Sequence, residues 1–188
     1  DANSFHVLAS DISNSGIFHF HSDANLYKNL LGFLYWITSP SLIIGEQVSI
    51  LSISISIIIL VSITDLLKLN KFQTPIIFTY AALPTMVTLG ALTLREPIQI
   101  LFLITATFFG LKMKLYSNMK FINFFLMILF ALAAGYFHKA IFLFGAVLIF
   151  TFLVWDIDSN LGKFTITKSR LLVLLFFPIF LIIFFYFA

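Results

Sequence analysis

The sequence predicts an all-α membrane protein: a polytopic bundle of about six transmembrane helices, preceded by an N-terminal extracytoplasmic segment with amphipathic interfacial helices. Two observations predict it. Of the 188 residues, 61% are hydrophobic and only 10% are charged, whereas a soluble domain has about 45–50% apolar and about 25% charged residues. In addition, several apolar stretches approach the roughly 20 residues that a membrane-crossing helix needs. These features exclude the soluble, disordered and fibrous classes.

Charge and cysteine content narrow the possible chemistry. The chain has no Cys, which excludes disulfides, thiolate metal sites and a cysteine nucleophile. Its net charge is +3, but the basic residues are scattered between apolar stretches. This pattern is typical of membrane topology, so we expect no nucleic-acid partner.

The chain starts at Asp1 without the basic and apolar regions of a signal peptide, and we expect it to be a core fragment that lacks earlier elements.

The chain divides into two parts. Residues 1–42 mix acidic, His, Ser and Asn residues with aromatics, which predicts an extramembrane segment with short pieces lying on the membrane surface. Residues 43–188 form the predicted transmembrane bundle. Its six expected spans are Ile43–Leu66, Pro75–Leu92, Pro97–Leu111, Phe121–Phe137, Ala140–Trp155 and Leu171–Phe187.

The distribution of Lys and Arg predicts the orientation. With residues 1–42 outside, eight basic residues fall on the inner side and three on the outer side. The inner set is Lys68, Lys71, Lys112, Lys114, Lys120, Lys163, Lys168 and Arg170, and the outer set is Lys28, Arg95 and Lys139. This excess fits the positive-inside rule. The N-terminal segment and the C-terminus are therefore both expected outside, in a multi-pass protein of the bacterial inner membrane.

Small residues predict where helices approach closely. The run Leu51 to Ser56 alternates like a strand, but an open strand in lipid leaves its backbone groups unpaired, so a helix is expected. On that helix one face carries Gly45, Ser49, Ser52 and Ser56. Ala131 and Gly135 form a similar pair on the fourth expected span. Such stripes are typical of helix–helix packing in membranes.

Charged and titratable residues gather at the outer ends of the expected spans, where they are candidates for function. They are Asp1, His6, Glu46, Arg95, Glu96, His138 and Lys139. Each also has a structural interpretation. Thr93 to Glu96 matches a capping box, and Pro97 suits a first helical turn. Glu46 can cap its own span. Arg95 and Lys139 can extend to lipid headgroups.

Two short motifs are weak candidates for metal or nucleotide binding. The run His19-Phe20-His21-Ser22-Asp23 has ligand types suited to zinc, but Ala24 stands where a metallohydrolase has a further His. Asp156-Ile157-Asp158 resembles the start of a calcium loop, but Leu161 replaces the required Gly. We interpret it as a solvated loop. No metal ligand is assigned and the cofactor is left open, with a divalent metal not supported by a clear motif.

Three stretches resemble the GT-C superfamily of membrane glycosyltransferases, in particular the bacterial family related to dolichyl-phosphate-mannose protein mannosyltransferases. Asp1 to Ala9 resembles the acidic start of that family's first outer loop. Leu30 to Ile37, with Pro40-Ser41-Leu42, resembles the approach to its second span. Leu83-Pro84-Thr85 through Arg95-Glu96 resembles its third span and the acidic turn after it, and Gly135 to Ala140 resembles a polar outer helix tip.

The resemblance implies a polyprenyl-phosphate-linked sugar donor, used at the extracytoplasmic face, and a glycan, lipid or protein acceptor. It implies Asp1 as the general base, because inverting glycosyl transfer removes a proton from the acceptor hydroxyl. The leaving phosphate needs cationic donors, for which Arg95 and Lys139 are the candidates. His6 and His138 are expected to position substrate, and Glu96 to orient Arg95.

Three alternatives stay open at this point. One is an O-antigen or exopolysaccharide polymerase, which shares the general plan. Another is a transporter or channel, which predicts charges near the bilayer midplane and broken helices. Pro84 is the interior breaker, but the central parts of the six expected spans carry no charge. The third is a non-catalytic subunit of a membrane complex.

Overall fold

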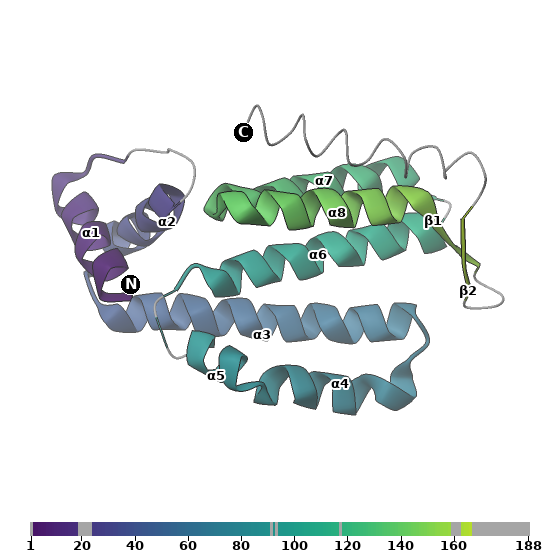
Figure 1. Cartoon of the computed structure of the whole chain (residues 1–188). Helices are drawn as coiled ribbons and strands as arrows, with labels where there is room; N and C mark the ends of the chain where they lie inside the picture. The colour runs from purple at the N-terminus through teal and green to yellow at the C-terminus, as the bar shows by residue number, and fades with distance from the viewer. Residues whose placement is uncertain are drawn as a thin grey trace.

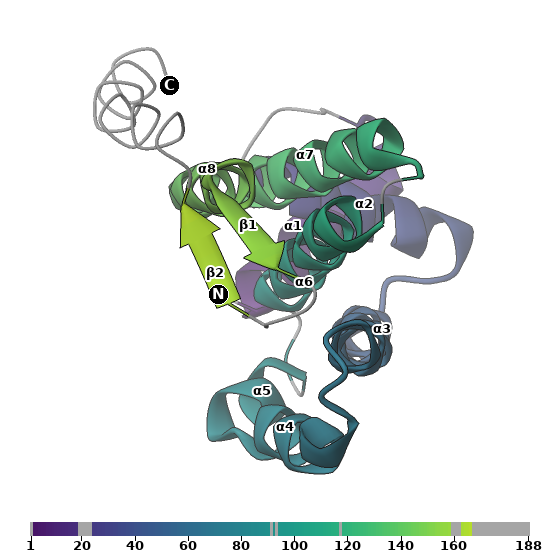
Figure 2. The same cartoon turned by 90° about the vertical axis from the view of Figure 1, so that its right-hand side faces the viewer.

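The computed structural model describes residues 2–18, 24–90, 92, 94–116, 118–158 and 163–166. The helices in this part of the chain are stacked in layers (Figure 1). At the top lie α7 (Lys120–Phe137) and α8 (Lys139–Val154), with α6 (Glu96–Leu115) beneath them. Next comes α3 (Leu42–Leu66), and the outermost layer is α4 (Asn70–Ala82) with α5 (Pro84–Gly90). Viewed along the bundle, α6, α7 and α8 form one group that α3 joins from the side of α6 (Figure 2).

Three of the described helices are long and apolar enough to cross a membrane: α3, α6 and α7. The expected first and fourth spans agree with α3 and α7 to within one residue. The third expected span is longer than predicted, because α6 continues through four further residues to Leu115. The apolar part of α8, Ile141–Val154, is a shorter helix. The sixth expected span, Leu171–Phe187, lies outside the described residues.

The second expected span is not one helix, so the prediction of a continuous Pro75–Leu92 helix was wrong. The chain forms α4 up to Ala82 and then α5 from Pro84. Leu83, between them, has φ −57° and ψ 125°. A proline disfavours the helical conformation in the residue before it and donates no backbone hydrogen bond. Pro84 therefore ends α4 and begins α5.

The small-residue stripe of α3 is confirmed as a packing face. Ser49, Ser52 and Ser56 are buried, as is Gly45. Their hydroxyl groups donate to backbone carbonyls one turn earlier on α3, as in the 2.8 Å bond from Ser56 to Ser52. The alternating run from Leu51 to Ser56 is thus helical, as expected in lipid. Since these side chains are short, α6 and the α4–α5 layer pack closely against α3.

The second small-residue pair brings α7 and α8 together. A Cβ atom on Gly135 would lie 2.3 Å from the Phe142 ring, and one on Gly145 would lie 3.2 Å from the Ala131 carbonyl oxygen. Ala131 is itself 1% exposed. The pair predicted from the sequence is therefore confirmed as a contact surface, and each helix presents a glycine to the other. The centre of the bundle is a small group of buried residues, the mid-bundle cluster: Ala106, Met127 and Ala131.

The N-terminal segment folds as a helical hairpin of α1 (Ala2–Ser15) and α2 (Ala24–Ile37). Gly16, with φ +66°, ends α1, a common role for glycine because it adopts the left-handed conformation without a steric penalty. The hairpin lies at the end of the bundle where α3, α6 and α8 begin and α7 ends (Figure 1). Buried residues from the hairpin and the bundle form the cap cluster: Phe5, Ala9, Tyr27, Leu31, Tyr35, Ile98 and Phe137.

After α8 the chain forms two short antiparallel strands, β1 (Trp155–Asp158) and β2 (Lys163–Ile166). Asp156 pairs with Thr165, and Asp158 pairs with Lys163. The interpretation of Asp156-Ile157-Asp158 as a loop was therefore wrong, since these residues are extended and paired. The fold is otherwise helical in the described part of the chain.

Candidate functional site

The polar residues singled out in the sequence are attached to helix ends that meet beneath the hairpin. Arg95 immediately precedes α6, Glu96 is its first residue, and His138 separates α7 from α8. The corresponding ends of α3, α6, α7 and α8 lie together at one end of the bundle (Figure 1). The connection from α3 to α4 and that from α6 to α7 lie at the opposite end. Because neighbouring helices run in alternating directions, the start of α6 and the connection between α7 and α8 meet at the same end of the bundle.

Arg95 links two of these helix ends. Its Nη1 donates a hydrogen bond of 3.2 Å to the backbone carbonyl of Phe137, the last residue of α7. Its Nε lies 3.7 Å from Oε1 of Glu96, and 16% of the Arg95 side chain is exposed. A carbonyl at the end of a helix carries partial negative charge, so it favours a cation there. Arg95 is thus held between the end of α7 and the carboxylate at the start of α6.

Glu96 does not form the predicted capping box. That motif requires Glu96 at the third helical position, with Thr93 before the helix. Instead α6 begins at Glu96 itself, Arg95 occupies the capping position and no side chain caps the helix. Pro97 does lie in the first turn, as expected. A carboxylate in that turn is still favourable, because the start of a helix carries partial positive charge.

His6 belongs to the hairpin rather than to the bundle. Its Nδ1 is 2.9 Å from the hydroxyl of Tyr35, so it joins α1 to α2. Tyr35 is 1% exposed. Burial raises the pKa of the Tyr35 hydroxyl, and the Glu46 carboxylate of α3 raises it further. Glu46, which was expected as a cap of its own span, is the fifth residue of α3 and lies within electrostatic reach of Tyr35.

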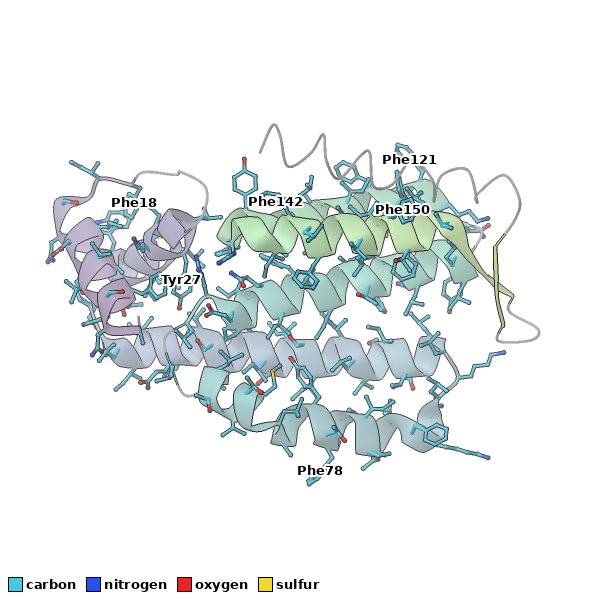
Figure 3. All side chains as sticks on the ribbon, in the orientation of Figure 1. Phe18, Tyr27, Phe78, Phe121, Phe142 and Phe150 are labelled. Carbon is cyan, nitrogen blue, oxygen red and sulfur yellow. The ribbon has the colours of Figure 1, made fainter. Side chains whose placement is uncertain are left out.

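Tyr27 lies between the hairpin and the bundle (Figure 3). Its side chain is fully buried, and its ring meets the edge of Phe5 with the centroids 5.1 Å apart. Burial raises the pKa of its hydroxyl, and the nearby Tyr35 and Glu96 raise it further, while a side-chain hydrogen bond with Ser49 acts in the opposite direction. Ser49 in turn donates a 2.8 Å hydrogen bond to the carbonyl of Leu92. Tyr27 therefore lies where α2, α3 and the start of α6 meet.

Buried polar atoms without a hydrogen-bond partner are concentrated here. Among the described residues, Glu96 Oε2 and Gln99 Nε2 belong to this group. Gln99 is 3% exposed and follows Glu96 by three residues on α6, which places the two on one face of the helix. Leaving such an atom buried and unpaired costs about 1–3 kcal/mol. The start of α6 therefore buries polar atoms at a cost in stability.

The sequence-predicted residues are brought together only in part. Arg95 and Glu96 are adjacent, and Arg95 contacts the residue before His138. His6 reaches the same end of the bundle through Tyr35. Asp1, the predicted base, lies outside the described residues, and so does the side chain of Lys139. The His19 to Asp23 motif also lies outside them, and the described residues contain no group of three or more His, Cys, Asp or Glu side chains suited to a metal ion.

Two residues of the site were missed in the sequence: Tyr27 and Gln99. Tyr27 was counted only among the aromatics of residues 1–42, which predicted a segment lying on the membrane surface. Gln99 had a signal, since it is an uncharged polar residue in the first turn of an otherwise apolar helix. Polar side chains inside membrane helices usually contact another polar group or a functional site. Compared with known protein families, curated proteins and solved structures, the chain matches none of them.

Proposed function

We propose that the chain is the membrane core of a glycosyltransferase that uses a polyprenyl-phosphate-linked sugar donor at the extracytoplasmic face of a bacterial inner membrane. The observation that carries the proposal is the placement of Arg95. This cation is held at the end of the bundle, beside Glu96 and the end of α7. The resemblance of Asp1 to Ala9 and of Leu83 to Glu96 to GT-C enzymes supports the same function.

The proposed reaction transfers the sugar from phosphate to an acceptor hydroxyl. The acceptor oxygen bonds to the anomeric carbon while the bond from that carbon to the phosphate oxygen breaks, and its electron pair leaves with the polyprenyl phosphate. Asp1 takes the proton of the acceptor hydroxyl as general base. Arg95 and Lys139 bind the leaving phosphate. His6 and His138 position the substrates, and the 3.7 Å separation of Glu96 and Arg95 supports the orienting role of Glu96.

Measuring donor binding to variants of Arg95 tests this proposal. We expect Arg95→Ala to weaken binding of polyprenyl phosphate to the protein in nanodiscs by about 10- to 150-fold. This factor corresponds to the loss of a charge-assisted contact of about 1.5–3 kcal/mol. Arg95→Lys keeps the positive charge and should recover part of the affinity. Lys112→Ala is the matched control, because Lys112 lies over the Phe108 ring in the last turn of the same helix.

Two results contradict the proposal. One is a wild-type protein that binds no polyprenyl phosphate. The other is an Arg95→Ala variant that keeps the wild-type helical content and the wild-type affinity. In the second case Arg95 has a structural role only, through its hydrogen bond to Phe137.

One observation favours transport as a second candidate function. The second predicted span is interrupted between α4 and α5 at Leu83, and transporters use discontinuous helices to build their binding sites. A solute flux across proteoliposomes that depends on the protein, and that is lost when Pro84→Ala restores a continuous helix, would support this candidate. The absence of charged side chains between Pro75 and Leu92 favours the transferase.

A further inference from the structure

The helix α2 has apolar side chains on two faces, and only one of them is covered. The covered face is buried in the cap cluster and consists of Tyr27, Leu31 and Tyr35. The other face is the outer stripe of α2, whose side chains are 37–61% exposed: Leu30, Phe33, Trp36 and Ile37. These positions share a face because they recur at helical spacing. A helix that is apolar on all sides is normally covered on all sides, so the outer stripe indicates a further apolar partner.

Three aromatic rings at the outer stripe contact one another. The rings of Phe33 and Trp36 are stacked, with their centroids 6.3 Å apart and their planes 29° apart. Phe18, from the segment after α1, meets both rings edge-on, at centroid distances of 6.1 Å and 6.5 Å. It lies on the side of the hairpin away from α3 (Figure 3). The three rings therefore form one apolar patch at the periphery of the hairpin.

The exposed face of α1 has a different character. Besides Val7 and Leu8, it consists of polar residues: Asn3, Ser4, Asp11, Asn14 and Ser15. The outer stripe of α2 has only the indole N–H of Trp36 as a polar group. The two helices also differ in position, because α1 packs mainly against α2, whereas α2 also contacts α3 and α7. The hairpin thus presents a mostly polar surface on α1 and an apolar one on α2, the helix nearer the bundle.

The outer stripe is close in the chain to a helix that can cross the membrane. The last residue of α2 is Ile37 and α3 begins at Leu42, so their Cα atoms are at most about 18 Å apart. Exposed apolar surface resumes directly after this connection, since Leu42 is 38% and Ile43 is 61% exposed. Because α3 is long and apolar enough to span a bilayer, the end of α2 is held near the depth at which α3 enters it.

The chemistry of the stripe suits this depth. Trp is enriched where headgroups meet acyl chains, because its ring is apolar while its N–H forms hydrogen bonds with the polar region. A helix lying in this boundary buries its apolar face by about 5–10 Å. The stripe carries no charged side chain that would lose its hydration there.

We propose that the outer stripe of α2, together with Phe18, anchors the hairpin in the headgroup–acyl boundary of the bilayer that α3 crosses. In this arrangement α1 lies on the water side of α2. The sequence predicts only that residues 1–42 include pieces at the membrane surface. The structure assigns the side chains that enter the membrane and the helix that remains outside it. The anchor is expected for a transferase and for a transporter alike, so it does not depend on the proposed function.

The fluorescence of Trp36 tests the anchor. The chain has two Trp residues, Trp36 and Trp155, so Trp155→Phe leaves Trp36 as the only one. The full chain with this change is placed in nanodiscs of phosphatidylcholine that carries bromine, a contact quencher, either near the headgroup end or near the far end of the acyl chains. We expect bromine near the headgroup end to remove most of the Trp36 emission and bromine at the far end to remove less. Iodide dissolved in the water should have little effect.

A Trp residue on α1 is the matched control. In the Trp155→Phe background, Trp36→Phe combined with Asn14→Trp moves the probe to an exposed position of α1. We expect iodide to quench this probe and brominated lipid to leave it unchanged. Nitroxide labels provide a second measurement that keeps both Trp residues, because the chain has no Cys. A label at Phe33→Cys should collide more with oxygen, which concentrates in the bilayer, than with a water-soluble nickel complex, and a label at Asn14→Cys should do the opposite.

Three results would overturn the anchor. Quenching of Trp36 by iodide and not by brominated lipid would place the stripe in water. Quenching by neither, with a Phe33→Cys label that neither oxygen nor nickel reaches, would mean that protein covers the stripe, either another part of the chain or a second copy. Strongest quenching by bromine at the far end of the acyl chains would place the stripe in the hydrocarbon core instead of at the boundary.

Discussion

The cap cluster and the mid-bundle cluster are built from different kinds of residue. The cap cluster buries Phe5, Tyr27, Tyr35 and Phe137, all of them large aromatic side chains. The mid-bundle cluster buries two alanines and Met127, and the neighbouring helix contacts use Gly135, Gly145 and the serines of α3. The buried serines of α3 bond to carbonyls of their own helix, as in Ser52 to Val48 at 2.8 Å. Unpaired polar atoms are concentrated next to the cap cluster.

This difference is the one expected between folding against water and folding against lipid. In water, burial of aromatic side chains stabilises a contact by about 25 cal/mol per Å² of apolar surface. In a bilayer the lipid tails are as apolar as the side chains, so helices associate through close packing of small residues. Phe78 and Phe121 fit the second case, since they are 71% and 81% exposed on the outer faces of α4 and α7 (Figure 3). The comparison therefore predicts that truncating a buried side chain destabilises the cap cluster more than the mid-bundle cluster.

The largest effect is expected in the cap cluster. Phe5→Ala removes a side chain that is 8% exposed and packs against Tyr27, and we expect a loss of about 3–4 kcal/mol in docking of the hairpin. Hydrogen exchange should become about 150- to 900-fold faster in α1 and α2 while α6 and α7 keep their protection. Val7→Ala is the control, because Val7 is 55% exposed on the same helix. Equal acceleration in α6 and α7 would show that the hairpin does not unfold separately.

A smaller effect is expected in the mid-bundle cluster. Met127→Ala creates a cavity at a fully buried position of α7, but lipid offers the unfolded helix the same apolar surroundings. We expect a loss of about 2 kcal/mol in the free energy of unfolding, at the low end of the range for such truncations in soluble proteins. Reversible unfolding in mixed micelles measures it. Leu129→Ala, at a position 48% exposed on the same helix, should cost less than about 0.5 kcal/mol. A loss larger than that of Phe5→Ala would reverse the comparison.

Features that depend on local sequence were predictable. The limits of α3 and α7 follow from long apolar runs, and the packing faces follow from small residues four apart, such as Ser52 and Ser56. The interruption before α5 was also visible in principle, since Pro84 restricts Leu83. Pro84 was identified as an interior breaker, but the span was still predicted as one helix because the hydropathy of the region is continuous across the proline. Hydropathy reports transfer into lipid and carries no information on backbone geometry.

Features that depend on tertiary contacts were only partly predictable. The sequence correctly predicted that Arg95 and His138 lie at the same end of the bundle. This prediction needs only the alternating directions of successive helices. The bond from Arg95 to the Phe137 carbonyl has no sequence signal, since any backbone carbonyl is equally available. Tyr27 has none either, because its burial is created by α1 folding over it. The extended pairing of Asp156 with Thr165 depends on a contact between separate segments, which a reading of the local motif does not include.

The central claim is that the hairpin and the polar end of the bundle share one side of the membrane, opposite the connections that follow α3 and α6. The chain contains no Cys, so single-cysteine variants at exposed positions report membrane sidedness without background. In intact cells, a membrane-impermeant maleimide should label Asn14→Cys and Ser39→Cys. It should label Asn70→Cys and Asn118→Cys only after permeabilisation. Labelling of Asn14→Cys and Asn70→Cys from the same side would contradict the claim, and with it the placement of the candidate site at the outer face.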